Sequence, residues 1–312
     1  MRLATCDLLL KSMKQRTLGG SFTLKGKGLH TGLQIEMRMM PAPENSGYII
    51  RRIDLPGQPE IKAVAENVCE ATRGTVLRQG EAQVSTVEHG FAALYASGID
   101  NCLVEVNAPE FPILDGSARL YMDEIAKVGT VEQSAEKNYL VVKEKLEYTS
   151  PDGLSHIEIL PADDFSVEVE IDFTSPVLGH QTAAISDFTQ FATEIAPCRT
   201  FVFVREIAPL LKMNLIRGGD LNNALVIYDQ PEAKDELQQL ADLLGQPCPH
   251  VDSLGYLSPL RFDNEPARHK LLDLIGDLSL VGQPIRGRVV ALRPGHSVNT
   301  AFGKQIREQL TK

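Results

Sequence analysis

The sequence predicts an α+β fold in which each of two sheets carries helices on one face. Its 312 residues are typical of about two domains. In both halves, segments with strand-like patterns come first and a helix-like segment follows, which is typical of α+β proteins. The stretch 129–137 is polar and mixed in charge, so we place the domain boundary there. We expect an extension at 1–12, a first domain at 13–134 and a second domain at 135–312.

The first half opens with predicted strands. Residues 14–18, 21–26 and 33–39 form the first three, and in the latter two apolar side chains alternate with polar ones, as in half-buried strands. Between them, residues 26–32 hold three glycines, which predicts a tight turn. A phosphate-binding loop is a weaker interpretation, because no helical pattern follows.

A helix is expected from Ser85, which has Glu88 three residues later in the arrangement of a capping box. Its alanines favour the helix and Gly98 can end it. The remaining elements of this half are a strand at 101–106, a turn at 115–117 and a helix at 118–127.

The second half repeats the order of strands followed by helices. Strands are expected at 139–147, 156–160, 166–173, 201–204, 224–228 and 286–292. Helices are expected at 187–195, 205–212, 266–280 and 298–310, and the third of these has proline near its first turn. A two-fold repeat of architecture is consistent with this order.

Composition excludes several classes of protein. A hydrophobic fraction of 43% and a charged fraction of 23% are typical of globular chains. The net charge of −10 argues against nucleic-acid binding, although a local cationic pocket for an anionic substrate remains open. No apolar run suits a membrane span or a signal peptide, so we expect a cytoplasmic protein. The five cysteines form no C-x-x-C pair and are expected to be reduced, without binding zinc.

The strongest candidate site lies on the expected helix 266–280. His269, Asp273 and Asp277 follow one another at intervals of four residues and therefore share one helical face. An imidazole and a carboxylate one turn apart can hold a metal, and a catalytic zinc needs a third protein ligand. The alternative is a solvated face with an ordinary His–Asp pair. The apolar neighbours favour a buried polar site, where carboxylates must be paired or bound to metal.

Glu88 and His89 form the second candidate. At a helix start the dipole favours Glu88, and His89 is free to bind a metal while Glu88 approaches the same ligand from the side. The alternative is a capping acid next to a partly buried histidine. Two further candidates are His296, in a loop after a strand, and residues 218–223, which form either a phosphate nest or a simple turn.

Several segments in fixed order together resemble one family. They are Ser-Thr-Val-Glu-His at 85–89, and the segments 98–101, 109–118, 199–201, 218–224, 265–277 and 295–296. They resemble the UDP-3-O-acyl-N-acetylglucosamine deacetylase family, zinc enzymes that commit Gram-negative bacteria to lipid A synthesis. The resemblance runs from about residue 13 to the C-terminus, and it implies helical layers packed together between two outer sheets.

The resemblance also implies a set of catalytic roles. Zinc would be held by His89, His269 and Asp273, and iron is an alternative occupant in cells. Glu88 would be the general base on the zinc-bound water. The other implied roles are His296 as general acid or electrostatic partner, Asp277 behind it, Thr200 at the oxyanion and Lys270 on the substrate.

For the substrate, the resemblance implies an acyl passage within an insert at about 199–228. Its walls would be Phe203, Val204, Ile207, Ile216, Gly219 and Ala224, with Leu77 across from them. The alternative is that some of these are core residues. Asp172 and Phe173 resemble the pair that engages the uracil. Phe201, next to Thr200 at the start of the insert, is also expected to bind the substrate. We expect a local basic surface at Lys270, Arg293 and protonated His296.

Three departures from the family pattern concern the substrate. No lysine follows the Asp152-Gly153 turn, Arg217 replaces an apolar residue, and the loop between Leu77 and Ser85 is short. The sequence resembles the variant found in Bacteroidetes, where a dehydratase is often fused. Nothing in it matches a dehydratase half, so we expect either a free-standing protein or a sequence that stops before the fusion. Two alternatives are a non-catalytic scaffold or fusion-partner relative, and a metallohydrolase of another acylated sugar. We expect a monomer that acts on a small UDP-acyl-sugar.

Overall fold

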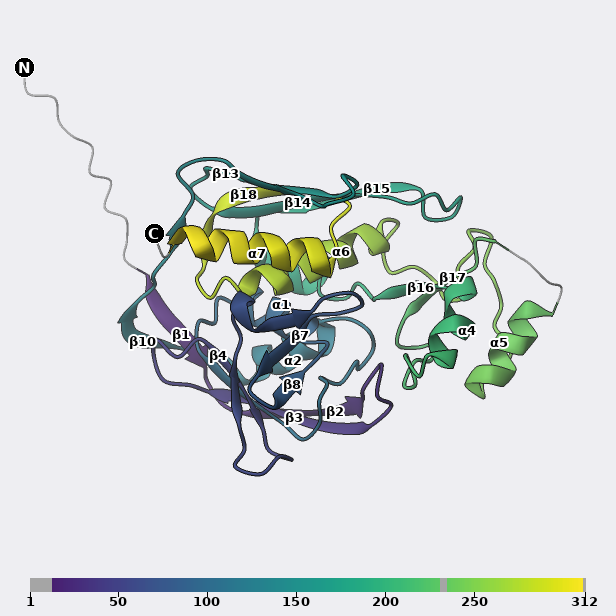
Figure 1. Ribbon diagram of the computed structural model, residues 1–312, viewed down its shortest axis with the longest axis horizontal. Helices are drawn as coiled ribbons and strands as arrows, with labels where there is room; N and C mark the ends of the chain where they lie inside the picture. Colours follow the sequence, from purple (N-terminus) through teal and green to yellow (C-terminus); the bar gives the residue numbers. More distant parts are fainter. Residues whose placement is uncertain (1–12, 231–234, 311–312) are drawn as a thin grey trace, which may run out of the picture.

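Residues 13–230 and 235–310 are described by a computed structural model, shown in Figure 1. The predicted extension at 1–12 lies outside the described residues. None of the helices in these two ranges is long and apolar enough to cross a membrane. Cys69, Cys102, Cys198 and Cys248 are free thiols, as predicted for this part of the chain.

A mixed five-stranded sheet forms the base of the first half. Its strands, in spatial order, are β2 (Phe22–Lys27), β3 (Gln34–Pro41), β9 (Cys102–Val106), β4 (Tyr48–Arg52) and β5 (Glu60–Lys62). Only the β4–β9 pair runs parallel among these neighbours. In β3 the side chains of Ile35, Met37 and Met39 are buried and those between them are exposed. The period-two pattern in the sequence thus marks one buried face.

Short strands complete this half. A small sheet contains β6 (Val68–Glu70), β7 (Val76–Gln79) and β8 (Ala82–Val84), preceded by a 3-10 helix at Ala65–Asn67. A two-stranded ladder pairs β1 (Lys14–Leu18) with β10 (Thr130–Glu136). The polar stretch at the expected boundary is therefore itself a strand. Most of its side chains are exposed, so its composition gave no strand signal.

The second half contains a second mixed sheet. Its strands are, in order, β12 (Leu146–Thr149), β13 (His156–Leu160), β18 (Ile285–Leu292), β14 (Phe165–Asp172) and β15 (His180–Ile185), with β11 (Leu140–Val141) also on β18. β18 runs parallel to β14 and antiparallel to β13. The single strand predicted at 139–147 is wrong: β11 and β12 are separate, because each pairs with a different neighbour.

Helices fill the space between the two sheets (Figure 1). They are α1 (Glu88–Ala96) and α2 (Arg119–Val128) from the first half, and α6 (Glu265–Ser279) and α7 (His296–Leu310) from the second. One apolar cluster spans both halves and includes Phe91 of α1 and Leu274 of α6. The predicted α+β class is confirmed, and so are the helical layers between two outer sheets.

A smaller unit extends from one end of the molecule, at the right of Figure 1. It contains the parallel strands β16 (Phe201–Phe203) and β17 (Leu225–Ile227) with α4 (Val204–Lys212) and α5 (Glu236–Leu244). A 3-10 helix at Phe188–Gln190 and the short α3 (Phe191–Glu194) precede it. The unit has two small apolar clusters of its own. None of the helices predicted from the sequence corresponds to α5.

Two helix starts differ from prediction. α1 begins at Glu88, and Ser85 instead pairs with Pro109 through its amide and its hydroxyl, so the expected capping box is wrong. Thr86 between them has a φ of 59°, which a helix does not allow. His296 is the first residue of α7 and not a loop residue, because the helix starts directly after Gly295.

Candidate active site

Two helices from different halves bring three potential metal ligands together. His89 comes from the first turn of α1, while His269 and Asp273 lie one turn apart on α6. Their ligand atoms all lie within 4.8 Å of one another. Asp273 Oδ1 is 3.2 Å from His269 Nε2 and 3.7 Å from His89 Nε2. The alternative of a solvated helical face is excluded, because all three side chains are buried.

The donor set fits a divalent cation. Among the described residues, Asp273 Oδ1 is buried and has no hydrogen-bond partner, whereas Oδ2 accepts a bond from Lys270. His269 Nδ1 lies 3.0 Å from the Cys198 carbonyl, which can only accept, so the proton sits there and Nε2 keeps its lone pair. Burial is the main cause that lowers the pKa of His89 to about 3, and the nearby His269 adds to it. The His89 imidazole therefore stays neutral. Two imidazole nitrogens and a carboxylate suit a metal ion.

Close packing of α6 on α1 creates the site. At Gly276 an added Cβ would lie 2.2 Å from the Glu88 carbonyl oxygen, so only glycine permits this approach. The rest of α6 is surrounded by core residues, which leaves its polar face pointing into the contact between the two helices. The site therefore depends on both halves.

Glu88 is the first residue of α1 and only 4% exposed. Its Oε2 accepts a hydrogen bond of 3.1 Å from the Thr75 amide. Burial raises the pKa of Glu88 to about 7, with His296 opposing this shift and the carboxylates of Asp277 and Asp273 adding to it. A carboxyl with this pKa can accept a proton near neutral pH.

His296 and Asp277 form a buried pair on the opposite side of the same site. His296 Nδ1 lies 2.9 Å from Asp277 Oδ2, which also accepts from the Asn299 amide group. Thr75 donates its hydroxyl to the other Asp277 oxygen. Burial favours neutral His296, but Asp277 and other carboxylates outweigh it and raise the pKa to about 9. His296 Nε2 then carries a positive charge 4.0 Å from Glu88 Oε1.

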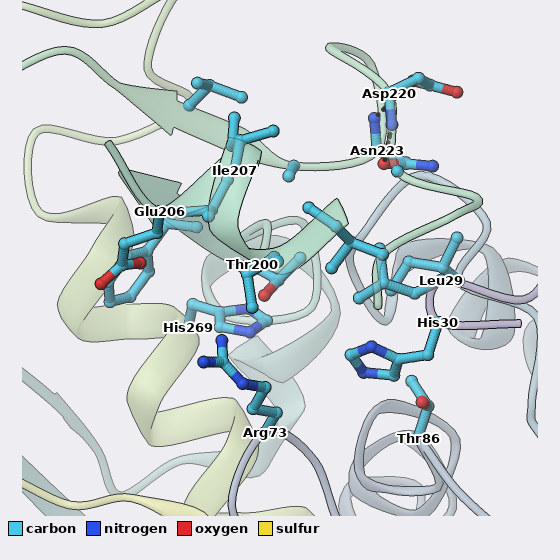
Figure 2. A pocket seen from close by; sticks show the side chains of 18 of the residues that line it. Leu29, His30, Arg73, Thr86, Thr200, Glu206, Ile207, Asp220, Asn223 and His269 are labelled. Atoms are coloured by element: carbon cyan, nitrogen blue, oxygen red, sulfur yellow. Dashed lines mark hydrogen bonds between the residues drawn. The ribbon is translucent and has the colours of Figure 1, made fainter. Parts of the chain in front are cut away.

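A cavity of about 230 Å³ opens onto the three potential metal ligands, Glu88 and His296. Figure 2 shows part of its lining. Its polar end holds the potential metal ligands, Glu88, His296, Thr200 and Lys270. The Lys270 ammonium lies 5.4 Å from the Phe201 ring centre. The remaining predicted residues on its wall are Phe201, Ile207, Ile216, Gly219 and Ala224. An apolar tunnel next to polar groups is typical of a site for an amphiphilic small molecule.

Other predicted residues do not line this cavity. Leu77 is fully buried in β7, between β6 and β8, because the small sheet packs it into the main core. Phe203 and Val204 are buried in apolar clusters of the insert, and neither lines the cavity. These three residues are core residues, the alternative that the sequence left open.

The predicted uracil pair and Arg293 lie beyond the cavity wall. Asp172 forms an ion pair with Arg293. The Phe173 ring meets the Phe201 ring edge-on, with 5.8 Å between centroids. Phe173 thus reaches the cavity only through Phe201.

The cavity also has lining residues for which the sequence predicted no role in a site. Leu29 and His30 come from the glycine-rich turn, Thr72 and Arg73 from the loop before β7, and Glu206 from the insert. Asp220 and Asn223, from the candidate turn at 218–223, line it as well (Figure 2). Nothing in the local pattern marks Arg73, and only tertiary folding brings it into the cavity. The glycines around Leu29 and His30 predicted a tight turn, but nothing in the sequence of the turn indicated that these two residues line a cavity.

Both stretches with a weaker phosphate-binding interpretation are turns. The carbonyl oxygens of Leu29 and His30 accept the amides of Gly218 and Arg217, so the two loops bind each other. In the second loop, Asp220 Oδ1 accepts the amides of Asn222 and Asn223. These amides are therefore already satisfied by the protein.

Comparison with known proteins gives consistent matches. A family model described as LpxC, UDP-3-O-acyl N-acetylglycosamine deacetylase, matches residues 15–242 and 250–308. The chain is 37% identical over 301 residues to the UDP-3-O-acyl-N-acetylglucosamine deacetylase of Thermosynechococcus vestitus, and the match covers 96% of each chain.

Higher identity occurs with longer proteins. The chain is 54% identical over 299 residues to a bifunctional enzyme LpxC/FabZ of Porphyromonas gingivalis, a match that covers 95% of this chain. A bifunctional enzyme LpxC/FabZ of Bacteroides thetaiotaomicron is also 54% identical, over 300 residues and 96% of this chain. The chain spans 65% of the length of these two relatives.

Proposed function

Because the chain belongs to the UDP-3-O-acyl-N-acetylglucosamine deacetylase family, we propose that it hydrolyses the N-acetyl group of a UDP-3-O-(3-hydroxyacyl)-N-acetylglucosamine. The products are acetate and the free amine of the sugar. One observation carries the proposal: a buried His89–His269–Asp273 cluster lies beside a carboxyl and a charged histidine at the polar end of an apolar cavity.

The cluster is proposed to hold a single Zn²⁺ ion. A bound Zn²⁺ lowers the pKa of water and polarises a carbonyl oxygen. The support is the unpartnered Asp273 Oδ1 and the two imidazole nitrogens that face it. The Lys270 ammonium on Oδ2 and the Cys198 carbonyl on His269 hold these donors in place.

Glu88 is proposed to be the general base and His296 its acidic counterpart. Glu88, with a pKa of about 7, removes a proton from the attacking water. His296, with a pKa of about 9, stays protonated, stabilises the developing negative charge and supplies a proton to the leaving amine. Asp277 keeps the His296 ring charged and fixes its orientation. The Thr200 hydroxyl faces the same cavity and is proposed to bind the developing oxyanion.

The apolar part of the cavity is proposed to receive the acyl chain. Ile207, Ile216 and Ala224 line it, and Gly219 leaves space for a chain. Lys270 lies on the Phe201 face at the polar end and is proposed to contact the sugar or its phosphates. Binding of the uracil at Asp172 and Phe173 stays a prediction.

The deciding experiment compares zinc content and acetate release of wild type with those of Asp273→Ala. We expect wild type to bind about one zinc per chain and the variant to lose both zinc and turnover, because a cation site needs its carboxylate. A wild-type protein that binds no zinc, or a variant with unchanged acetate release, would refute the proposal.

A second variant separates metal binding from proton transfer. Glu88→Gln keeps the size of the side chain and removes the base, so we expect normal zinc content and a loss of turnover of about 10²–10⁴-fold. Full turnover in this variant would show that another group is the base. Glu105→Gln, which alters an ion pair on the outer sheet, is the matched control.

A further inference from the structure

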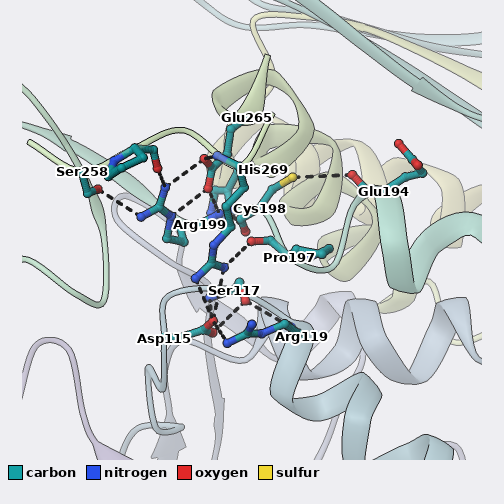
Figure 3. A network of polar contacts seen from close by, with 12 residues as sticks. Asp115, Ser117, Arg119, Glu194, Pro197, Cys198, Arg199, Ser258, Glu265 and His269 are labelled. Atoms are coloured by element: carbon teal, nitrogen blue, oxygen red, sulfur yellow. Dashed lines mark hydrogen bonds and ion pairs between the residues drawn. The ribbon is translucent and has the colours of Figure 1, made fainter. Parts of the chain in front are cut away.

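The segment 197–200 runs beside the first turns of α6 and serves the site at two points (Figure 3). The Cys198 carbonyl oxygen accepts the Nδ1 proton of His269 at 3.0 Å. Two residues later, Thr200 lines the cavity. The position of this short piece of backbone therefore affects both a potential metal ligand and a cavity hydroxyl.

Contacts from other elements hold every residue of this segment. Pro197 O accepts a bond from the Arg261 guanidinium, and the Thr200 amide donates to Gly116 O at 2.7 Å. The Arg199 amide donates to Glu265 Oε1 at 3.0 Å, and the Cys198 amide donates to Ile195 O at 3.0 Å. Each of the four residues is therefore bonded to a residue outside the segment.

Glu265 is the centre of these contacts. It is the first residue of α6, one turn before His269, and it is fully buried. Its carboxylate accepts two bonds from the Arg199 guanidinium, at 2.8 and 3.0 Å. It also accepts the amides of Arg199 and Arg261, at 3.0 and 2.7 Å. A carboxylate at a helix N-terminus is in addition favoured by the helix dipole.

Arg199 is buried as well, with 6% of its surface exposed. Its remaining donors bond to Ser258 Oγ at 3.0 Å and to Pro259 O at 2.7 Å. Arg261 extends the network to Asp115 of the first half, 3.2 Å away (Figure 3). A buried ion pair with bidentate geometry holds the two backbone segments that carry it more firmly than a surface pair does. Loss of either partner would leave a buried charge unpaired, which is costly.

We propose that Glu265 and Arg199 are positioning residues of the metal site, which act by holding the Cys198 carbonyl against His269 Nδ1. The inference rests on the proposed function, since it assumes that His269 binds a cation. Neither residue touches the cluster itself. Groups that orient a ligating histidine in this way commonly change metal affinity by about 10–100-fold when they are removed.

The test measures Zn²⁺ affinity of the full chain by competition with a chelating dye. Glu265→Gln keeps the shape and removes the charge, so we expect the Kd for Zn²⁺ to rise by about tenfold. Glu265→Asp keeps the charge and should recover part of that loss. Glu105→Gln, which alters a Glu–Arg pair on the outer sheet, should leave the Kd unchanged.

A second variant tests the same network if Glu265→Gln fails to fold. Arg261 is partly exposed, and Arg261→Gln removes its bonds to Pro197 and Asp115 without leaving a buried charge. We expect its Zn²⁺ Kd to rise several-fold, with little change of the melting temperature in excess chelator.

The outcomes are distinguishable. If Glu265→Gln and Arg261→Gln melt lower in excess chelator but bind Zn²⁺ like wild type, the network only stabilises the fold and the inference is overturned. If wild type itself binds no Zn²⁺, the proposed function fails instead.

Discussion

At the scale of single residues, Arg73 is the only arginine among the described residues that line the cavity. No ion pair or side-chain hydrogen bond of its guanidinium occurs within the described part of the chain. Thr75, two residues after Arg73, fixes this loop to both halves, because its amide donates to Glu88 and its hydroxyl donates to Asp277. An unpaired guanidinium on a fixed loop suits an anionic ligand.

We therefore expect Arg73→Gln to weaken binding of an anionic UDP-sugar. Loss of a charge-assisted hydrogen bond of about 1.5 kcal/mol corresponds to a roughly tenfold rise in KM, with kcat little changed. Steady-state kinetics at low and high salt measure both constants. Arg78→Gln is the control, since Arg78 bonds only to the nearby Gln83 among the described residues. An unchanged KM at low salt would contradict this role.

The ionisation of Glu265 links the same scale to stability. Burial opposes its charge, but the bonds from Arg199 and from two backbone amides outweigh burial and hold its pKa below the ordinary 4.5. A lowered pKa in the folded state stabilises the protein fully above that value. This stabilisation is lost as the pH falls through the folded-state pKa.

We expect Glu265→Gln to be less stable than wild type at neutral pH, and the gap to narrow below pH 4.5. Urea unfolding of both proteins at neutral pH and at several lower values measures it. The sign is fixed, because the variant cannot lose a charge that it lacks. A gap that widens with acid would contradict the assigned ion pair.

At the scale of elements, the crossing of α1 and α6 decides the geometry of the site. Gly276 permits the backbones to approach so closely that an added Cβ would lie 2.2 Å from the Glu88 carbonyl oxygen. The same crossing sets the separation between His89 on one helix and His269 on the other. Their rings meet edge-on, with centroids 5.0 Å apart.

Gly276→Ala is therefore expected to push the helices apart. Overpacking of a core costs about 1–3 kcal/mol, and the displaced His89 should weaken Zn²⁺ binding as well. Gly303→Ala in α7 is the control, because its added Cβ would find its nearest neighbour at 3.9 Å. Alanine there should be neutral or stabilise by up to about 1 kcal/mol. Thermal unfolding and zinc titration of both variants check the contrast.

At the scale of the whole molecule, the potential metal ligands come from both halves of the chain. His89 belongs to the first half, while His269 and Asp273 belong to the second. A cation held by all three would bind the folded assembly and not either unfolded half. Binding of this kind adds to stability by mass action.

Removal of the metal should therefore lower the melting temperature. At a free Zn²⁺ concentration of about 100 times Kd the expected stabilisation is about 2.7 kcal/mol, which corresponds to roughly 4 °C for a chain of this size. Calorimetry with and without chelator measures the difference. Asp273→Ala should melt at one temperature under both conditions. An equal chelator effect in that variant would place the cation elsewhere.

Much of the architecture was predictable because it follows local patterns. Alternation marked β3, and the apolar run behind a proline marked α6. Elements without such patterns were not predicted from the sequence. β10 is mostly exposed and polar, and the insert around α5 gave no clear signal. Ser85 had the spacing of a capping box, but pairing with Pro109 outweighed that local preference.

The candidate site was predictable to a similar degree. The helical spacing of His269 and Asp273 indicated a shared face, and the ordered motifs added Glu88, His89 and His296 through resemblance. Leu77, Phe203 and Val204 were assigned to a passage, but packing buries them in the core. Arg73 was not predicted as a site residue, because no spacing rule connects it to α6.

The period of each regular element and the chemistry of its side chains could be derived from the amino-acid sequence alone. These properties depend on residues a few positions apart in the chain. Which elements meet could not be derived in this way, because it depends on tertiary packing. The approach of α6 to α1 at Gly276, the position of Arg73 and the bonds between Glu265 and Arg199 each join residues far apart in the chain. Their energies arise from burial and close contact, which exist only after the two halves have packed.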